Sequence, residues 1–234
     1  MLSGKVREGV KYYPIYLDIG EKRCVVVGGG DVAARKILRL LECGAVVSVV
    51  SRKLTTTLAD MVAQGQINHV DDNYDRKYLA GAFLVIGATD QEEVNDRIAA
   101  DCRARGVMVN IVDDPGRCDF ILPSLVNRGS LSIAVSTDGK SPALARKLRE
   151  DLSAQFGPEY EYYLDLLGWL REMIIAVDRP ADENRDIFTA LVNSPLLGHI
   201  RAGRWQEAEQ TIRDLTAQQI DLTAFINRAA KRIS

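Results

Sequence analysis

The chain has 234 residues, a formal net charge of −2 and 47% hydrophobic residues. This length and apolar content are enough to bury a real core in one large or two small domains. The small negative charge gives no argument for binding nucleic acid or an anionic membrane. No window offers the roughly 18 uninterrupted apolar residues of a membrane span.

The start of the chain and its cysteines favour a reducing compartment. Residues 1–8 lack the apolar core of a secretory signal. Cys24, Cys43, Cys102 and Cys118 show no C-x-x-C spacing, and the first two are most simply explained as small hydrophobic side chains. We therefore expect a cytoplasmic protein.

A glycine-rich turn between two predicted strands has the spacing of a dinucleotide-binding loop. Residues 24–27 form an apolar β-branched run. Gly28, Gly30 and Ala33 follow in G-x-G-x-x-A order at the start of a helical pattern, and residues 46–50 read as a second buried strand. In this context the first glycine permits the tight turn, and the second lets a pyrophosphate approach the backbone. The N–H groups at the helix start would then bind phosphate. The alternative, a glycine turn without a ligand, leaves these flanking elements unexplained.

The alternation of helices and strands continues to about residue 112. We expect a helix (55–64), a short strand (67–70), a strong strand (83–88), a helix (91–105) and a last buried strand (107–112). This rhythm predicts an α/β fold with a Rossmann-type, doubly wound parallel sheet. A ligand would lie at the carboxyl ends of the strands, where the strand order reverses.

The pattern changes after Pro115. Two apolar runs, at residues 120–126 and 131–136, predict a hairpin with a turn at 127–130. Its apolar faces and edge need a cover, for which a second subunit is the simplest source, so we expect a homodimer. A helix should begin at Ser141-Pro142 and run to about residue 155.

From residue 158 the chain reads as wholly helical, with apolar stripes that are packing surfaces. We therefore divide the chain into a dinucleotide-binding Rossmann domain (1–114), a small β-containing dimerisation segment (115–150) and an all-helical domain (151–234).

Four motifs together resemble the precorrin-2 dehydrogenase family. They are residues 27–36 (VGGGDVAARK), 88–90 (ATD) with Asn95, 109–113 (VNIVD) and 141–149 (SPALARKLR). That family includes the amino-terminal module of siroheme synthase, which oxidises precorrin-2 to sirohydrochlorin with NAD and in some members also inserts ferrous iron. The resemblance covers about residues 12–150 clearly. It implies a NAD-dependent oxidoreductase in siroheme biosynthesis with a tetrapyrrole substrate. Siroheme synthase continues into a uroporphyrinogen methyltransferase module that does not follow here, so we expect a separate methyltransferase upstream.

Asp113 is the candidate catalytic base. It follows a predicted core strand at the mouth of the expected crevice, and the resembling family has its catalytic aspartate at this motif position. The carboxylate would accept a proton while the nicotinamide accepts a hydride. The alternative is a residue that merely ends the strand. Asp114 fits that turn role better, because consecutive side chains at a strand end diverge.

The fingerprint and the resemblance together imply the cofactor contacts. These are Gly28, Gly29, Gly30, Asp31, Val32, Ala33, Ser51, Ala88 and Thr89. Thr89 or Asp90 could instead simply cap the next helix. The second strand ends in Ser51-Arg52 and lacks the usual acidic residue for the ribose hydroxyls, and Arg52 alone would suggest NADP. The family implies NAD without that acid, and NAD is our expectation.

The substrate carries acetate and propionate carboxylates, which need cations and hydrogen-bond donors. We expect Asn110, Arg117, Lys140 and Arg146 to contribute these contacts. His69 and His199 show no metal-ligand spacing, so a built-in metal is not expected and any iron would be a substrate.

Three functions stay open: a dehydrogenase, a bifunctional dehydrogenase and sirohydrochlorin ferrochelatase, and a nucleotide-sensing regulatory module. The sequence does not separate the first two. The third expects an acidic residue after the second strand and gives no account of residues 109–113.

Overall fold

The structure is a computed structural model that describes residues 11–217, 221–223 and 225–226. Residues 1–8, from which we expect no secretory signal, lie outside that range. The chain forms two compact units, Met1–Leu122 and Pro123–Ser234. The division into three parts made from the sequence stays a prediction.

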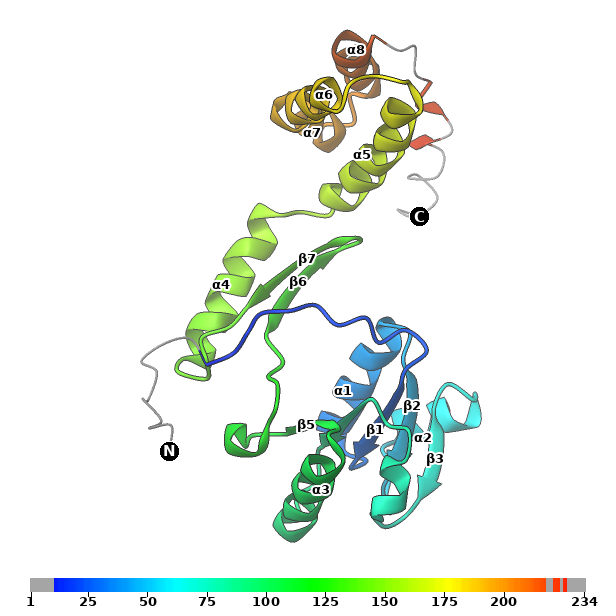
Figure 1. The fold of residues 1–234 in the computed structure, drawn as a ribbon, viewed down its shortest axis with the longest axis vertical. Helices are drawn as coiled ribbons and strands as arrows, with labels where there is room; N and C mark the ends of the chain where they lie inside the picture. The colour runs from blue at the N-terminus through cyan, green and yellow to red at the C-terminus, as the bar shows by residue number, and fades with distance from the viewer. Residues whose placement is uncertain (1–10, 218–220, 224, 227–234) are drawn as a thin grey trace. The chain divides into compact units, whose positions relative to one another are not determined.

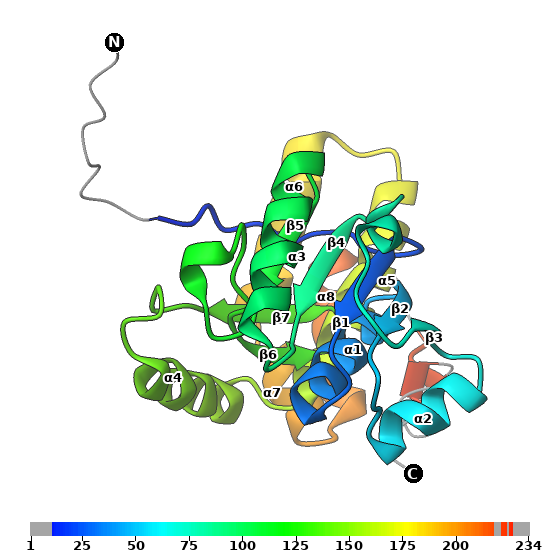
Figure 2. The same ribbon diagram turned by 90° about the horizontal axis from the view of Figure 1, so that it is seen from below.

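Five parallel strands form the centre of the first unit (Figures 1 and 2). They are β1 (Arg23–Val27), β2 (Val46–Val50), β3 (Asn68–Asp71), β4 (Leu84–Gly87) and β5 (Met108–Ile111). Their order is β3-β2-β1-β4-β5, which places the first strand in the middle. Because the strand order reverses at β1, the carboxyl ends of β1 and β4 form the switch point at which such sheets bind ligands. The predicted Rossmann-type sheet is confirmed.

Helices cover both faces of this sheet. They are α1 (Asp31–Glu42), α2 (Thr56–Ala63) and α3 (Glu92–Arg105). Ile37 of α1 packs into one cluster with Val26 of β1. Ile98 of α3 packs into a second cluster with Val25, whose side chain points to the opposite face. The apolar run of β1 is therefore buried on both faces, as is typical of a central parallel strand.

Short local signals fix the ends of these helices. The side chain of Thr55 accepts a hydrogen bond from the Leu58 N–H at the start of α2, at 3.4 Å. Gly106 ends α3 with a φ of +67°, a conformation that glycine adopts without steric cost. Two 3₁₀ turns, η1 (Arg76–Leu79) and η2 (Pro115–Arg117), were not expected from the sequence.

The second unit begins with the antiparallel hairpin of β6 (Ser124–Arg128) and β7 (Leu131–Val135). Arg128 pairs with Leu131, so the turn is shorter than the predicted 127–130 segment. The predicted first strand also starts too early. The Phe120 carbonyl accepts a hydrogen bond from the Asn110 side chain at 2.9 Å, which holds this part of the chain against β5.

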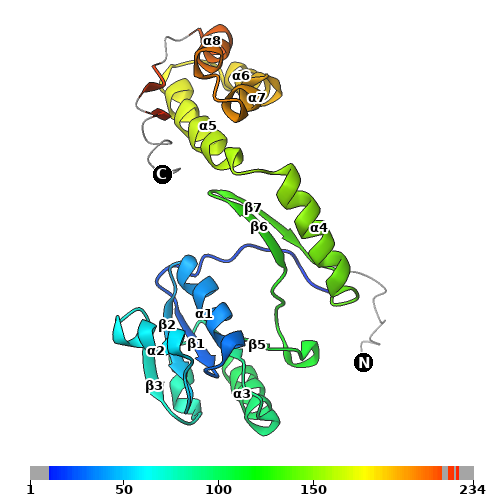
Figure 3. The ribbon, with the colours of Figure 1, turned by 180° about the vertical axis from the view of Figure 1, so that it is seen from behind.

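Helix α4 (Pro142–Gln155) packs against the hairpin (Figure 3). The Arg128 guanidinium donates to the carbonyl oxygen and to the Oγ of Ser153, at 3.0 and 2.7 Å. Ser141 caps the helix by accepting a hydrogen bond from the Leu144 N–H at 3.2 Å. Part of the cover that we expected from a second subunit is therefore supplied by the chain itself.

The remaining helices pack around one apolar core. They are α5 (Glu159–Ala176), α6 (Ala181–Asn193), α7 (Leu196–Arg201) and α8 (Trp205–Thr216). Leu166, Leu170 and Ile174 of α5 meet Ile212 of α8 in this core, and all four are fully buried. The predicted stripes are thus packing surfaces. No helix in the described part of the chain is long and apolar enough to cross a membrane.

Candidate dinucleotide-binding site

The first two glycines of the loop after β1 leave no room for side chains. Gly28 has a φ of +126°, and a Cβ added there would lie 2.2 Å from the Ala88 carbonyl oxygen. A Cβ on Gly29 would lie 2.0 Å from the Lys53 carbonyl oxygen. The loop is held in place by the Gly28 N–H, which donates to the Val50 carbonyl at 2.9 Å. These glycines bring the loop against the ends of β2 and β4.

Gly30 differs, because a Cβ added there meets nothing within 4 Å. It is the N-cap residue of α1, and no side chain caps the helix there. The first-turn N–H groups of a helix carry partial positive charge and lack intrahelical acceptors. An open space beside an uncapped helix start is what a pyrophosphate needs, so these residues fit a dinucleotide. Behind them Ala33 is fully buried, Val32 is half-buried and Asp31 is exposed.

Ser51, Ala88 and Thr89 adjoin this loop. A Cβ on Gly29 would lie 2.6 Å from the Ser51 Oγ, which itself donates to the Lys53 carbonyl. The Ala88 N–H donates to the Val27 carbonyl at 2.7 Å. These contacts place both residues at the carboxyl edge of the sheet.

The alternative role of Thr89 or Asp90 as a helix cap is wrong. The N-cap residue of α3 is Gln91, and no side chain caps that helix. The Thr89 Oγ1 instead accepts a hydrogen bond from the Gln91 N–H at 3.1 Å. Asn95, which the sequence analysis did not place in the site, donates from Nδ2 to the Thr89 carbonyl at 3.0 Å. Arg52 is exposed and donates to the Asn73 Oδ1 at 2.8 Å.

Asp113 lies at the same edge of the sheet. The Val112 N–H donates to the Gly87 carbonyl at 2.9 Å, which fixes the chain just before Asp113 beside the end of β4. Asp113 is exposed and has a φ of +62°, a left-handed conformation that is uncommon for a residue with a side chain. Backbone strain of this kind clusters at functional sites.

Lys36 was missed by the sequence analysis. It is half-buried on α1, and burial and then Arg35 lower its pKa, while the Asp113 carboxylate acts in the opposite direction. The Asp113 carboxylate therefore acts on the Lys36 ammonium group at this edge. The only sequence signal was the position of Lys36 in the 27–36 motif. A lysine on a helix is ordinarily interpreted as a solvent-exposed residue.

The structure brings two of the four expected substrate contacts near Asp113. Asn110 is buried in β5, and its amide donates to the Phe120 carbonyl. The Arg117 guanidinium lies close to three carboxylates, and its hydrogen bond with Glu92 is the main cause that raises its pKa. Lys140 and Arg146 belong to the second unit, where Arg146 pairs with a neighbour on its own helix.

The groups that could carry metal or thiol chemistry are dispersed. Within the described ranges, no three or more His, Cys, Asp or Glu side chains gather in a group that could hold a metal ion. Cys24 and Cys102 are fully buried, and burial is the main reason that their pKa values rise to about 11 and about 12.

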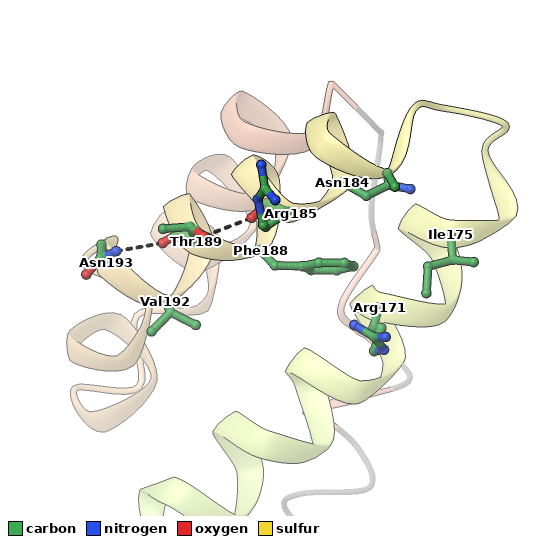
Figure 4. A pocket seen from close by; sticks show the side chains of 9 residues that line it. Arg171, Ile175, Asn184, Arg185, Phe188, Thr189, Val192 and Asn193 are labelled. Atoms are coloured by element: carbon green, nitrogen blue, oxygen red, sulfur yellow. Dashed lines mark hydrogen bonds between the residues drawn. The ribbon is translucent and has the colours of Figure 1, made fainter.

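A separate hollow of about 630 Å³ lies in the helical unit, between α5 and α6 (Figure 4). Arg171 and Arg185 line it together with the ring of Phe188, whose centre is 5.2 Å from the Arg171 guanidinium carbon. None of the predicted site residues lines this hollow.

Two family models match the chain. One, described as "Putative NAD(P)-binding", covers residues 15–124, and the other, "Sirohaem biosynthesis protein central", covers residues 128–155. The siroheme synthase of Photobacterium profundum is 36% identical over 205 residues, which are 88% of this chain and 44% of that protein. The siroheme synthase of Methylobacillus flagellatus is 37% identical over 188 residues, 79% of this chain and 40% of that protein. The chain thus spans less than half the length of these relatives.

A solved structure shares the fold. It is titled "SirC, precorrin-2 dehydrogenase", and it superimposes with a TM-score of 0.70 at 25% identity over 85% of this chain and 100% of that one. The matched NAD(P)-binding region contains β1 to β5, the glycine loop and Asp113, and the central segment contains the second hairpin strand and all of α4. These matches therefore show a siroheme synthase-like module, similar to the amino-terminal part of those enzymes.

Proposed function

We propose that the chain oxidises precorrin-2 to sirohydrochlorin with NAD. The observation that carries this proposal is the position of Asp113 at the same sheet edge as the glycine loop. The Val112 N–H donates to the Gly87 carbonyl at 2.9 Å, which holds the residue before Asp113 at the end of β4. The next residue of that segment, Ala88, lies against Gly28 of the loop. The name of the structural relative and the NAD(P)-binding family match support the same reaction.

The oxidation removes a hydride and a proton from the substrate, and different parts of the site serve each transfer. The bound nicotinamide supplies the hydride acceptor. The N–H groups at the start of α1, with the open space at Gly30, hold the pyrophosphate, while Ser51, Ala88 and Thr89 line the cofactor. An oxygen of the Asp113 carboxylate accepts the proton that leaves the substrate.

Several further features belong to the same proposal. Asn110, Lys140 and Arg146 remain the predicted substrate contacts. We also propose a homodimer in the cytoplasm, with a uroporphyrinogen methyltransferase activity upstream supplying the substrate. The hairpin keeps partly exposed apolar side chains, such as Ile133, for the dimer contact.

Insertion of ferrous iron into sirohydrochlorin is the second candidate activity, because the curated relatives are siroheme synthases. Iron would be a substrate held by the macrocycle, and Asp113 would assist pyrrole deprotonation. The regulatory module is the weaker alternative, since Ser51 occupies the position after β2 where such a module expects an acid.

The decisive experiment is an anaerobic assay with precorrin-2 and NAD on the wild type and on Asp113→Asn. Asparagine tolerates a positive φ, so the fold should persist while the basic carboxylate is lost. Turnover should fall by about 10²–10⁴-fold, with the affinity for NAD unchanged. Asp60→Asn, the same change at an exposed position on α2, is the matched control and should keep full activity.

Two results would count against this assignment. A wild type that does not oxidise precorrin-2 would remove the proposed reaction, and an active Asp113→Asn would leave the residue as a turn former. A parallel assay with sirohydrochlorin and ferrous iron tests the second activity. Iron insertion that survives in Asp113→Asn would show that the two reactions use different bases.

A further inference from the structure

We infer that Arg117 is a positioning residue that holds the loop bearing Asp113 in place. This inference rests on the proposed function, because it gives Arg117 a role in the same reaction. It assigns the guanidinium an indirect role in place of the direct substrate contact expected from the sequence.

The turn after β5 holds Asp113 in an uncommon backbone conformation. Asp113 adopts a left-handed φ of +62° and is exposed. Such a conformation persists only when the surrounding structure holds it. The Asp114 N–H donates to the Ile111 carbonyl at 3.2 Å, which closes a tight turn around Asp113. The direction of the Asp113 carboxylate therefore depends on how firmly the following residues are anchored.

The Arg117 guanidinium anchors this loop to α3. The Arg117 Nη1 atom lies 2.6 Å from a Glu92 carboxylate oxygen and 3.1 Å from an Asp114 oxygen. The Nη2 atom lies 3.0 Å from an Asp96 oxygen. Glu92 and Asp96 belong to α3, whereas Asp114 adjoins Asp113, so one side chain joins the loop to the helix. Arginine suits this role because its planar fork offers several donors in a fixed geometry.

Arg117 also offsets a local excess of negative charge. Glu92, Asp96 and Asp114 converge on the single cation of Arg117, whose side chain is only 25% exposed. Without that cation the three carboxylates would repel one another and loosen the contact between the loop and α3. A guanidinium that already contacts three carboxylates has little capacity left for a substrate carboxylate.

The rest of the loop is tied to β5 independently. The Asp119 N–H donates to the Val109 carbonyl at 2.9 Å, and the Val109 N–H donates to the Asp119 carboxylate at 3.0 Å. The Cys118 thiol lies 3.0 Å from the Asp114 carbonyl oxygen and 3.2 Å from the Ile111 carbonyl oxygen. Because these bonds remain when Arg117 is replaced, we expect the loop to loosen and the fold to persist.

The experiment measures turnover, KM, NAD affinity and hydrogen exchange in Arg117→Met. We expect kcat to fall by about 10- to 100-fold, since a shift of about 1 Å in a reacting group can cost 10²-fold. KM for precorrin-2 and the affinity for NAD should stay within about threefold, as expected when an interaction acts only on the chemical step. The amide protons of Gly116 and Arg117, which are bonded to the Asp114 side chain, should exchange faster with solvent.

Two further variants sharpen the test. Asp96→Asn removes one carboxylate of the anchor, and combined with Arg117→Met it should cost no more than Arg117→Met alone, because the two residues act as one unit. This variant also carries the test if Arg117→Met fails to fold. Arg97→Met is the matched control. It removes a neighbouring arginine of α3 whose guanidinium carbon lies 5.6 Å from the Tyr74 ring centre, and it should change neither kcat nor loop exchange.

The results distinguish a positioning role of Arg117 from a substrate contact and from a surface ion pair. A raised KM with unchanged kcat would overturn the inference and make Arg117 a substrate contact. Unchanged kcat together with unchanged exchange would reduce the anchor to a surface ion pair. A wild type without precorrin-2 oxidation refutes the proposed function, whereas the exchange measurement still shows whether Arg117 holds the loop.

Discussion

The prediction that tests the glycine loop most sharply is Gly30→Val. The backbone at Gly30 is extended (φ −83°, ψ −175°), and a Cβ there meets nothing within 4 Å, so valine should fit the folded chain. The cost in folding free energy is the poorer N-cap, about 1 kcal/mol. The side chain would, however, fill the space through which a pyrophosphate reaches the start of α1.

The expected loss of binding follows from the hydrogen bonds at stake. A hydrogen bond to a charged group contributes about 1.5–3 kcal/mol. If valine removes two N–H contacts to the pyrophosphate, the loss is about 3–6 kcal/mol, which weakens NAD binding by about 10²–10⁴-fold. Gly28→Ala should behave differently, since its Cβ would clash with the Ala88 carbonyl at a φ of +126° and unfold the domain.

Isothermal titration calorimetry measures the affinity of each variant for NAD, and a thermal melt shows whether the variant is folded. Gly168→Val serves as the control, because Gly168 lies in α5 and a Cβ there also meets nothing within 4 Å. An unchanged affinity for NAD in folded Gly30→Val would refute the reasoning. A clear preference of the wild type for NADP would show that the cofactor assignment is wrong.

Three further predictions concern assembly, thiol reactivity and the helical core. Ile133→Asp should weaken the proposed homodimer, whereas light scattering that finds a wild-type monomer at micromolar concentration would remove that proposal. At pH 8 a thiol reagent should label exposed Cys43 in the native protein but Cys24 and Cys102 only after unfolding, because their raised pKa values and burial suppress the reactive thiolate. Leu166→Ala should lower the free energy of unfolding by about 2–5 kcal/mol in a denaturant titration, since this side chain is fully buried; a loss below 1 kcal/mol would contradict its place in the core.

The first half of the fold was predictable because its signals are local. The apolar strands, the glycine at each turn and the Thr55 cap each specify an element within a few residues, and the structure has all of them. The parallel order also followed, since strands that alternate with helices leave few topologies.

The misplaced features depend on contacts between distant segments. The strand expected from residue 120 begins only at Ser124, because Asn110 bonds the Phe120 carbonyl from a strand ten residues earlier. Arg117 was predicted to contact the substrate, because Glu92 and Asp96, the carboxylates that it pairs with, lie far away in sequence. A single sequence gives charges and spacing but does not reveal which distant carboxylates a guanidinium meets.

The central place of β1 has a consequence for how the chain acquires its structure. Val26 pairs with Val49 on one side and with Ile86 on the other, so the first strand made gains its second neighbour only after much of the unit has been synthesised. Until then the apolar run 24–27 has one open edge, and pairing of this non-local kind is slow and prone to aggregation. The helices of the second unit pack against segments that are close in sequence, so their contacts can form soon after each helix has been synthesised. A growing chain therefore has its greatest need of chaperone protection between the emergence of β2 and that of β4.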